Sequence, residues 1–162
     1  MTGPVQEITP DVDAGTVLAG AQFMDAFRVD VGATNVNARE ACTRMVLNGP
    51  RWVDALVRLR NILVRPFGLK TSGDGAPAPG GLIGLFPVLS ETPERLIAGF
   101  NDYHLDFRIV VDVAKDAVSR QVTVTTLVKT NNLLGRTYLA LITPFHKIVA
   151  RGMMGRIAEP AH

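Results

Sequence analysis

The chain has one cysteine, Cys42, and only three serines among its 162 residues. A single cysteine excludes an intrachain disulfide and a metal site built from cysteines alone. No serine stands in a Gly-x-Ser-x-Gly turn and no His-Glu-x-x-His sequence occurs, which removes the motifs of serine hydrolases and zinc peptidases. Cys42 stands among the apolar residues of a predicted helix, where a thiol is typically an inert packing group.

The sequence also lacks a strong charge of either sign and lacks nucleotide-binding loops. The formal net charge is +2, and the seventeen basic residues are spread along the chain, whereas nucleic-acid-binding domains carry a dense basic face with stacking aromatics. The Gly- and Pro-rich stretch 70–81 lacks the Gly-Lys-Ser/Thr ending of a phosphate loop and the third glycine of a dinucleotide loop. We therefore expect no nucleic-acid partner and no nucleotide cofactor, with a connecting loop at 70–81.

The first twenty residues lack the basic start and apolar core of a secretory signal. We expect residues 1–20 to be an N-terminal lead-in and the protein to be cytoplasmic. No run of about twenty uncharged apolar residues is present, so stable membrane insertion is not expected either.

Alternation of apolar and polar residues predicts a strand over 22–31, in which Asp25 interrupts the apolar side. Asn37 and Glu40 resemble a capping box that opens a helix over 41–47. Further predicted elements are a helix between Pro50 and Pro66 and strands over 82–89, 95–100, 103–113 and 121–129. Strands that follow one another this closely are typical of an antiparallel meander with one dry face.

The last quarter of the chain, from Asn131 to Ile157, predicts one long amphipathic helix. Six apolar side chains recur at helical spacing and form one stripe: Leu134, Tyr138, Leu141, Phe145, Ile148 and Val149. The predicted opposite face carries Arg136, Thr143, Lys147 and Arg151. A stripe of this length needs a broad apolar surface against it, so we expect it to pack on the dry face of the meander.

The order of the elements and several residues together resemble a known family. The residues are Trp52, Leu59-Arg60-Asn61, Phe67-Gly68-Leu69, Leu105-Asp106-Phe107-Arg108, Asn132 with Gly135-Arg136-x-Tyr138, and Pro144-Phe145-His146. Over roughly 21–157 this pattern is similar to a bacterial family of unassigned function in the START/Bet v1-like (SRPBCC) superfamily. The resemblance implies an α+β helix-grip fold, in which a curved antiparallel sheet wraps around a long C-terminal helix and two short helices follow the first strand. It also implies a cavity between sheet and helix, and some members of the family accompany a short-chain-reductase-like domain.

We therefore expect a helix-grip domain over 21–157, with a C-terminal tail at 158–162, that binds a small hydrophobic or amphipathic ligand in this cavity. The candidate ligand-binding residues supply apolar walls and a few polar groups: Phe27, Trp52, Tyr103, Phe107, Thr126, Tyr138, Phe145 and His146. One alternative is a cyclase- or hydratase-like enzyme that moves protons with Tyr138, His146 or Asp25. Another is a non-catalytic partner subunit of an oxidoreductase. The sequence indicates no metal and no cofactor, and it permits a homodimer.

Two polar residues have more than one interpretation. His146 follows Pro144, which cannot donate a hydrogen bond to the carbonyl group four residues earlier. The imidazole either stabilises that break, which we favour, or serves a ligand or proton transfer. Asp25 would point inward from a regular strand and would then need a partner, such as Arg60 or Tyr138. A bulge or strand start that turns Asp25 outward is the interpretation we favour.

Overall fold

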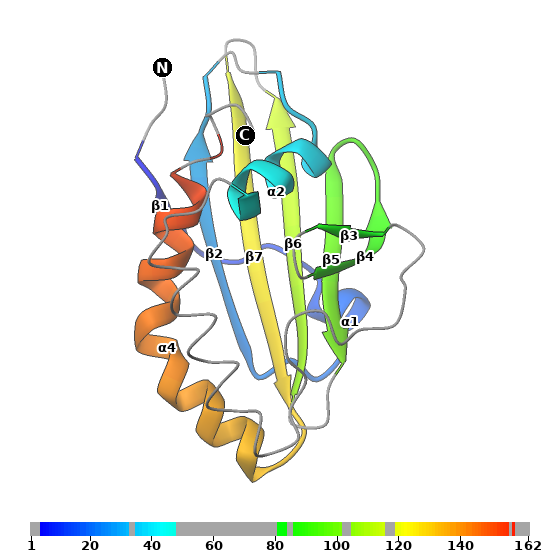
Figure 1. The fold of residues 1–162 in the computed structure, drawn as a ribbon, viewed down its shortest axis with the longest axis vertical. Helices are drawn as coiled ribbons and strands as arrows, with labels where there is room; N and C mark the ends of the chain where they lie inside the picture. The colour runs from blue at the N-terminus through cyan, green and yellow to red at the C-terminus, as the bar shows by residue number, and fades with distance from the viewer. Residues whose placement is uncertain are drawn as a thin grey trace.

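The computed structural model describes residues 4–32, 35–47, 81–83, 86–101, 105–115, 119–155 and 157. Within these residues the strands are β1 (Gln6–Ile8), β2 (Phe23–Asp30), β3 (Leu82–Ile83), β4 (Phe86–Glu91), β5 (Arg95–Asn101), β6 (Leu105–Lys115) and β7 (Arg120–Thr130). The helices are α1 (Ala14–Val17), α2 (Ala38–Leu47) and α4 (Leu133–Met154). The strands pair antiparallel in the order β1-β2-β7-β6-β5-β4-β3, and the fold class is α+β (Figure 1).

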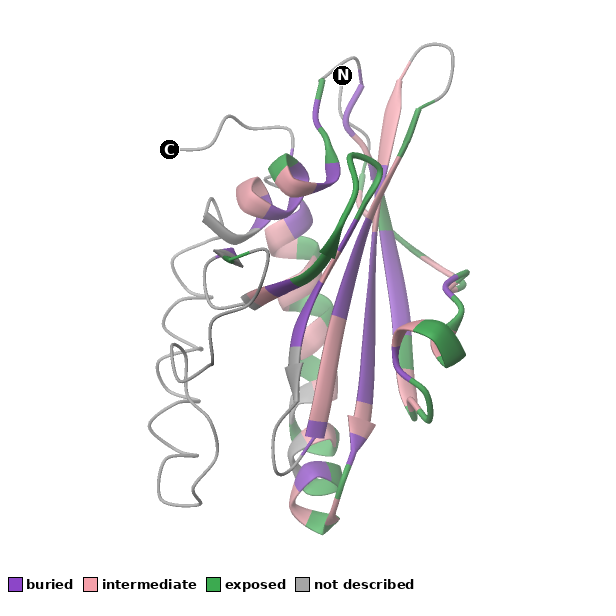
Figure 2. Cartoon of the chain, turned by 90° about the vertical axis from the view of Figure 1, so that its right-hand side faces the viewer, coloured by how far each residue is buried: buried purple, intermediate pink, exposed green. Residues whose placement is uncertain are grey.

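The helices lie on both sides of the sheet. Helices α2 and α4 cover one face, and α1 lies against the other, as the two perpendicular views show (Figures 1 and 2). The larger core lies under α2 and the C-terminal end of α4, and it includes Phe27, Val29, Met45, Leu96, Val111, Val122, Met154 and Ile157. This arrangement buries one face of α2 and the C-terminal end of α4 against a mostly apolar sheet surface, while α1 contributes the partly buried Ala14 and Val17 on the other side.

The centre of the sheet is a regular ladder of three strands. β2 pairs with β7 from Phe23–Val128 to Asp30–Gln121 without a register shift, and β6 pairs with β7 from end to end. Because side chains alternate between faces along a strand, every second residue of β7 faces α2 and α4. These residues are Val122, Val124, Thr126 and Val128, all buried, which confirms the predicted dry face.

Two expectations about the meander are wrong. The single strand predicted over 82–89 is two strands, because β3 and β4 pair antiparallel with each other. The face predicted to be wet is dry at its centre, where Val110 and Leu127 are fully buried beneath a cluster that includes Val12 and Leu18. A strand that is covered on both faces carries apolar residues on both faces. Val110 and Leu127 are the apolar residues that interrupt the face predicted to be polar.

The N-terminal residues take part in the fold. β1 extends the sheet by pairing with β2, and α1 begins at Asp13, whose carboxylate accepts a hydrogen bond from the backbone N–H of Gly15 at 3.0 Å. α2 begins as the sequence predicts, because the side chain of Asn37 accepts a hydrogen bond from the backbone N–H of Glu40 at 2.8 Å. The segment expected to be a lead-in thus contributes a strand and a helix.

The rotation of α4 about its own axis differs from the expectation. Leu141, Phe145 and Ile148, the centre of the predicted buried stripe, are 67%, 60% and 58% exposed. Two residues of the face predicted to be opposite, Lys147 and Arg151, reach β1 and the residue before it. The predicted contact with the sheet is therefore wrong for Leu141, Phe145 and Ile148. The side of α4 that meets the sheet carries Lys147 and Arg151 together with Ala150 and Met153, which pack against the core.

Two predicted elements lie outside the described residues, namely the helix between Pro50 and Pro66 and most of the loop at 70–81. Trp52 and Tyr103 also lie outside them. Among the described helices, none combines the length and the apolar character that crossing a membrane requires.

Candidate functional site

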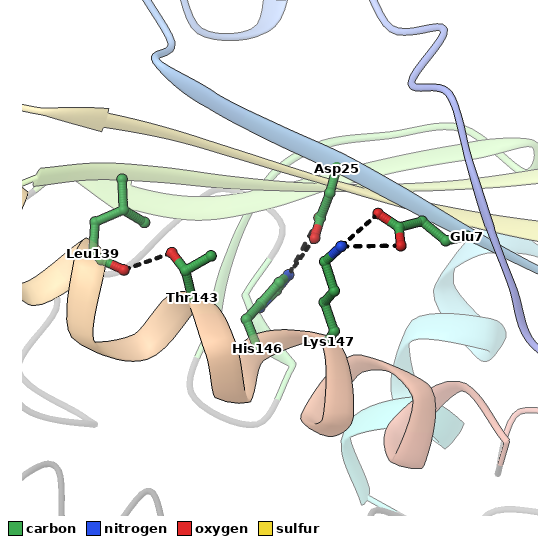
Figure 3. Close-up of polar contacts among 6 residues, drawn as sticks. All are labelled: Glu7, Asp25, Leu139, Thr143, His146 and Lys147. Carbon is green, nitrogen blue, oxygen red and sulfur yellow. Dashed lines mark hydrogen bonds and ion pairs between the residues drawn. The ribbon is translucent and has the colours of Figure 1, made fainter.

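A buried carboxylate and an imidazole connect the sheet to α4. Asp25 on β2 is only 6% exposed, and the Nε2 atom of His146 on α4 lies 3.2 Å from its Oδ1 atom (Figure 3). A carboxylate only accepts hydrogen bonds, so Nε2 is the donor in this contact. The strand is regular at this point, which corrects the expectation of an outward-facing Asp25. Among the described side chains its partner is His146, while Arg60 and the side chain of Tyr138 lie outside the described residues.

The surroundings of this pair are tightly packed. The ring of Phe23 meets the imidazole edge to face, with centroids 5.8 Å apart, and Thr126 is the residue opposite Asp25 on β7. The Oδ2 atom of Asp25 is also 3.2 Å from Nε2 of His146, but it makes no hydrogen bond within the described part of the chain. His146 is therefore the partner that offsets the cost of burying this carboxylate.

Two basic residues beyond His146 fix the same helix to the N-terminal strand. Lys147 pairs with both carboxylate oxygens of Glu7 at 3.1 Å (Figure 3). Arg151 places its guanidinium carbon 5.5 Å from the ring centroid of Phe27 and donates a hydrogen bond to the carbonyl oxygen of Val5. These contacts hold the C-terminal half of α4 over β1 and β2.

Pro144 lies inside α4, two residues before His146. The hydroxyl group of Thr143 donates a hydrogen bond of 2.6 Å to the carbonyl oxygen of Leu139, one turn earlier (Figure 3), a bond that is often found where helices bend. The Nε2 atom of His146 reaches Asp25 instead of the helix backbone. The favoured interpretation of His146 as a group that stabilises the proline break is thus corrected: its observed bond is between helix and sheet.

An open groove of about 400 Å³ lies beside this pair, between the start of β2, the end of β7 and the N-terminal half of α4. Its described lining consists of Gln22, Phe23, Thr130, Arg136, Leu139, Ala140 and Thr143. The four helix residues have the spacing i, i+3, i+4 and i+7, which places them on one face. The lining mixes apolar and polar side chains, as small-molecule sites commonly do.

The N-terminal end of α4 is fixed by the chain itself. Asn132 precedes the helix in an extended conformation, and its side chain accepts a hydrogen bond from the backbone N–H of Gly135 at 2.9 Å. This cap fixes where the helix begins. It therefore also fixes the position of Arg136, which follows Gly135 in the first turn.

The structure places the predicted ligand-binding residues at several depths. Phe27 is fully buried in the core, Thr126 is buried and Phe107 is half-buried against the core. Phe145 is 60% exposed, while His146 is half-buried and borders the groove through Phe23. The remaining three residues cannot be placed as side chains: Tyr138 lies on α4 with its side chain outside the described atoms, and Trp52 and Tyr103 lie outside the described residues.

The residues that line the groove differ from the predicted set. Sequence reasoning assigned Arg136 and Thr143 to the outer face of the helix and did not consider Gln22 or Thr130. A usable signal was present, because Arg136, Leu139 and Thr143 share one helix face immediately after the last strand. That position places the face beside the end of β7.

Metal binding and reaction at a cysteine find little support in the described residues. No group of three His, Cys, Asp or Glu residues there could hold a metal ion. Burial raises the pKa of the Cys42 thiol to about 12, although the nearby Arg39 lowers it in part. The thiol is therefore protonated at neutral pH, as expected for an inert core cysteine.

Comparison with known proteins gives a family. No curated protein and no solved structure matches the chain. A family model described as a protein of unknown function, DUF2867, matches residues 17–153, a span that includes α4 almost to its end and every strand except β1. The chain therefore belongs to the DUF2867 family of proteins of unknown function.

Proposed function

We propose that this protein binds a small hydrophobic or amphipathic molecule in the groove between β2, β7 and α4. The observation that supports the proposal is the composition of the groove: its described lining combines the apolar residues Phe23, Leu139 and Ala140 with four polar residues, in a volume of about 400 Å³. Ligand sites commonly have 300–1,000 Å³ and this mixture of surfaces. In this proposal the apolar side chains supply binding free energy through loss of water contact, and the polar side chains orient the molecule.

We also propose that the fold is of the helix-grip type and that the family lies within the START/Bet v1-like superfamily. The support is the element order, an antiparallel sheet followed by one long helix over the same face as α2. In this proposal the groove is the mouth of the space that the sheet and the helix enclose.

An eight-carbon alcohol is a suitable test ligand. Arg136 and Thr143 are seven positions apart on the helix, which is about 10 Å at 1.5 Å per residue, close to the length of an extended octyl chain. Titration of ¹⁵N-labelled protein with 1-octanol should give saturable amide shifts centred on Phe23 and Ala140.

A matched pair of tryptophan variants locates the site. Ala140 lines the groove and is exposed, so Ala140→Trp fills the groove without disturbing the core. Thr137 is exposed on the same helix and is not part of the described lining, so Thr137→Trp is the control. We expect Ala140→Trp to weaken octanol binding at least tenfold and Thr137→Trp to bind like the parent protein. Equal binding by the two variants would overturn the proposal.

Acid–base catalysis on a bound molecule is a second candidate function, favoured by the Asp25–His146 pair. A carboxylate that orients an imidazole recurs in enzymes that transfer protons. Phe23 is shared by the pair and the groove, so a ligand on Phe23 would lie near the imidazole. In this case Asp25→Asn would retain octanol binding in the groove, but it would abolish hydrogen–deuterium exchange at the α-carbon of a bound ketone such as 2-octanone. Absence of such exchange in the parent protein would remove this candidate.

A further inference from the structure

The groove contains one charged side chain among its described lining residues, Arg136. No hydrogen bond or ion pair of its guanidinium group is present in the described structure, whereas Arg39, Arg95 and Lys147 each pair with a carboxylate. Arg136 is exposed and has no counter-ion among the described residues, so its guanidinium group is suited to an anionic group of a ligand, because its planar donors match a carboxylate.

Gln22, another residue of the same lining, supplies a second donor. The backbone N–H of Thr130 donates a hydrogen bond of 2.8 Å to the side chain of Gln22, and the Thr130 hydroxyl group contacts the same atom. A backbone N–H can only donate, so this atom of Gln22 is the carbonyl oxygen Oε1. The amide nitrogen Nε2 is then directed elsewhere and has no partner within the described residues.

None of the other described lining side chains carries a negative charge that would repel an anion. The other described lining residues are Phe23, Thr130, Leu139, Ala140 and Thr143, and none carries a carboxylate. The nearest buried acid, Asp25, has His146 as its partner, and Phe23 lies between that pair and the groove.

We propose that the ligand of the groove is an amphipathic carboxylate, whose anionic end is bound by Arg136 and by the amide of Gln22 while its apolar chain lies on Phe23, Leu139 and Ala140. This inference rests on the proposed function, since it names the ligand class of the same groove. The lining combines donor groups with apolar side chains, and a molecule with one charged end and one hydrocarbon chain requires both.

Three ligands of equal chain length test the charge of the ligand: octanoate, 1-octanol and octylammonium, each titrated by isothermal calorimetry and amide shifts at pH 7.5. We expect octanoate to bind roughly tenfold more tightly than octanol and octylammonium to bind most weakly. Rising salt concentration should weaken octanoate binding and leave octanol binding unchanged, because salt screens only the charged contact.

Two variants assign the effect to the proposed donors. Arg136→Gln should lower octanoate affinity to that of octanol and leave octanol affinity unchanged. Gln22→Glu keeps an acceptor for Thr130 but replaces the free donor by an acceptor, so it should weaken octanoate roughly tenfold and favour octylammonium. Arg28→Gln removes an equal charge from an exposed side chain of β2 that bonds Thr123, and it should bind all three ligands like the parent protein.

The outcomes separate the two proposals. Equal affinity for octanoate and octanol, or equal loss of octanoate affinity in Arg136→Gln and Arg28→Gln, would overturn the carboxylate inference while groove binding stands. Failure of all three ligands to bind would remove the proposed function itself, and the inference with it.

Discussion

The Nε2 atom of His146 lies 3.2 Å from each carboxylate oxygen of Asp25, across the boundary between α4 and β2. The side chain of Asp25 is 8% exposed and that of His146 is 22% exposed. If the contact is broken, little water can therefore reach these groups to replace the lost hydrogen bond. A buried charge that loses its partner retains the full cost of its desolvation. The pair therefore acts as a polar connection between the last helix and the sheet.

Removal of His146 should destabilise the fold. His146→Ala leaves the carboxylate of Asp25 buried without a donor, and we expect a loss of about 2–3 kcal/mol in the free energy of unfolding. For a chain of this size that loss corresponds to a fall of roughly 5–10 °C in the melting temperature. Chemical denaturation followed by circular dichroism measures it.

The double variant Asp25→Leu/His146→Leu is the control for this prediction. It removes both polar groups, and its stability should exceed that of His146→Ala because no unpaired charge remains. A His146→Ala protein as stable as the parent, or a double-mutant cycle without coupling between the two sites, would contradict the finding that these residues depend on each other.

Gly99 on β5 should not tolerate a side chain. Its φ angle is +153°, and a Cβ atom there would lie 2.1 Å from the backbone carbonyl oxygen of Phe107 on β6. Gly99→Ala should therefore cost more than about 2 kcal/mol, because backbone atoms of β5 or β6 would have to move. Gly155→Ala is the control, since Gly155 has φ −61° and ordinary distances to its neighbours. A thermal melt in which the two variants unfold together would show that β5 adapts more easily than the geometry indicates.

The exposed side of α4 should be tolerant of polar substitution. Phe145 is 60% exposed, so Phe145→Gln should change the free energy of unfolding by less than about 1 kcal/mol and leave octanol binding unaltered. Substitution of Leu96, which is fully buried, by Ala should instead cost about 2–5 kcal/mol. A loss for Phe145→Gln as large as that for Leu96→Ala would show that this side of the helix is covered in solution.

Cys42 should react with thiol reagents only after unfolding. Burial raises the pKa of its thiol to about 12, so at pH 8 almost no thiolate is present in the folded protein. The unfolded chain has a thiol pKa of about 8.5. The stability contributed by the protonated thiol is therefore present below that value and is lost as the pH rises from about 8.5 toward 12. Labelling by a disulfide reagent at pH 8, with and without denaturant, measures the difference, and rapid labelling of the native protein would contradict it.

Strand patterns predicted most of the sheet, for a physical reason that is visible in β7. One face of this strand is buried at every second residue from Val122 to Val128, so the apolar residues there leave a clear period of two in the sequence. β3 and β4 were merged in the prediction because both are apolar, and a short apolar run does not show where one strand ends and the next begins.

The rotation of α4 could not be predicted from its apolar residues alone. Apolar side chains occur on more than one side of this helix, so the stripe through Leu141 and Phe145 gave an amphipathic pattern without identifying the side that meets the sheet. The contacts that orient the helix are polar: His146 with Asp25, and Lys147 with Glu7. Their partners are more than a hundred residues away in sequence. The groove is equally hard to predict, since Gln22 and Arg136 line it together only after β2, β7 and α4 have assembled.

Met154 and Ile157 lie in the same hydrophobic cluster as Phe27 and Val29. During synthesis, β2 therefore leaves the ribosome long before the side chains that complete its cover have been translated. The nascent chain therefore exposes this apolar surface until residue 157 has emerged. During that period a chaperone can bind to β2 and its neighbours.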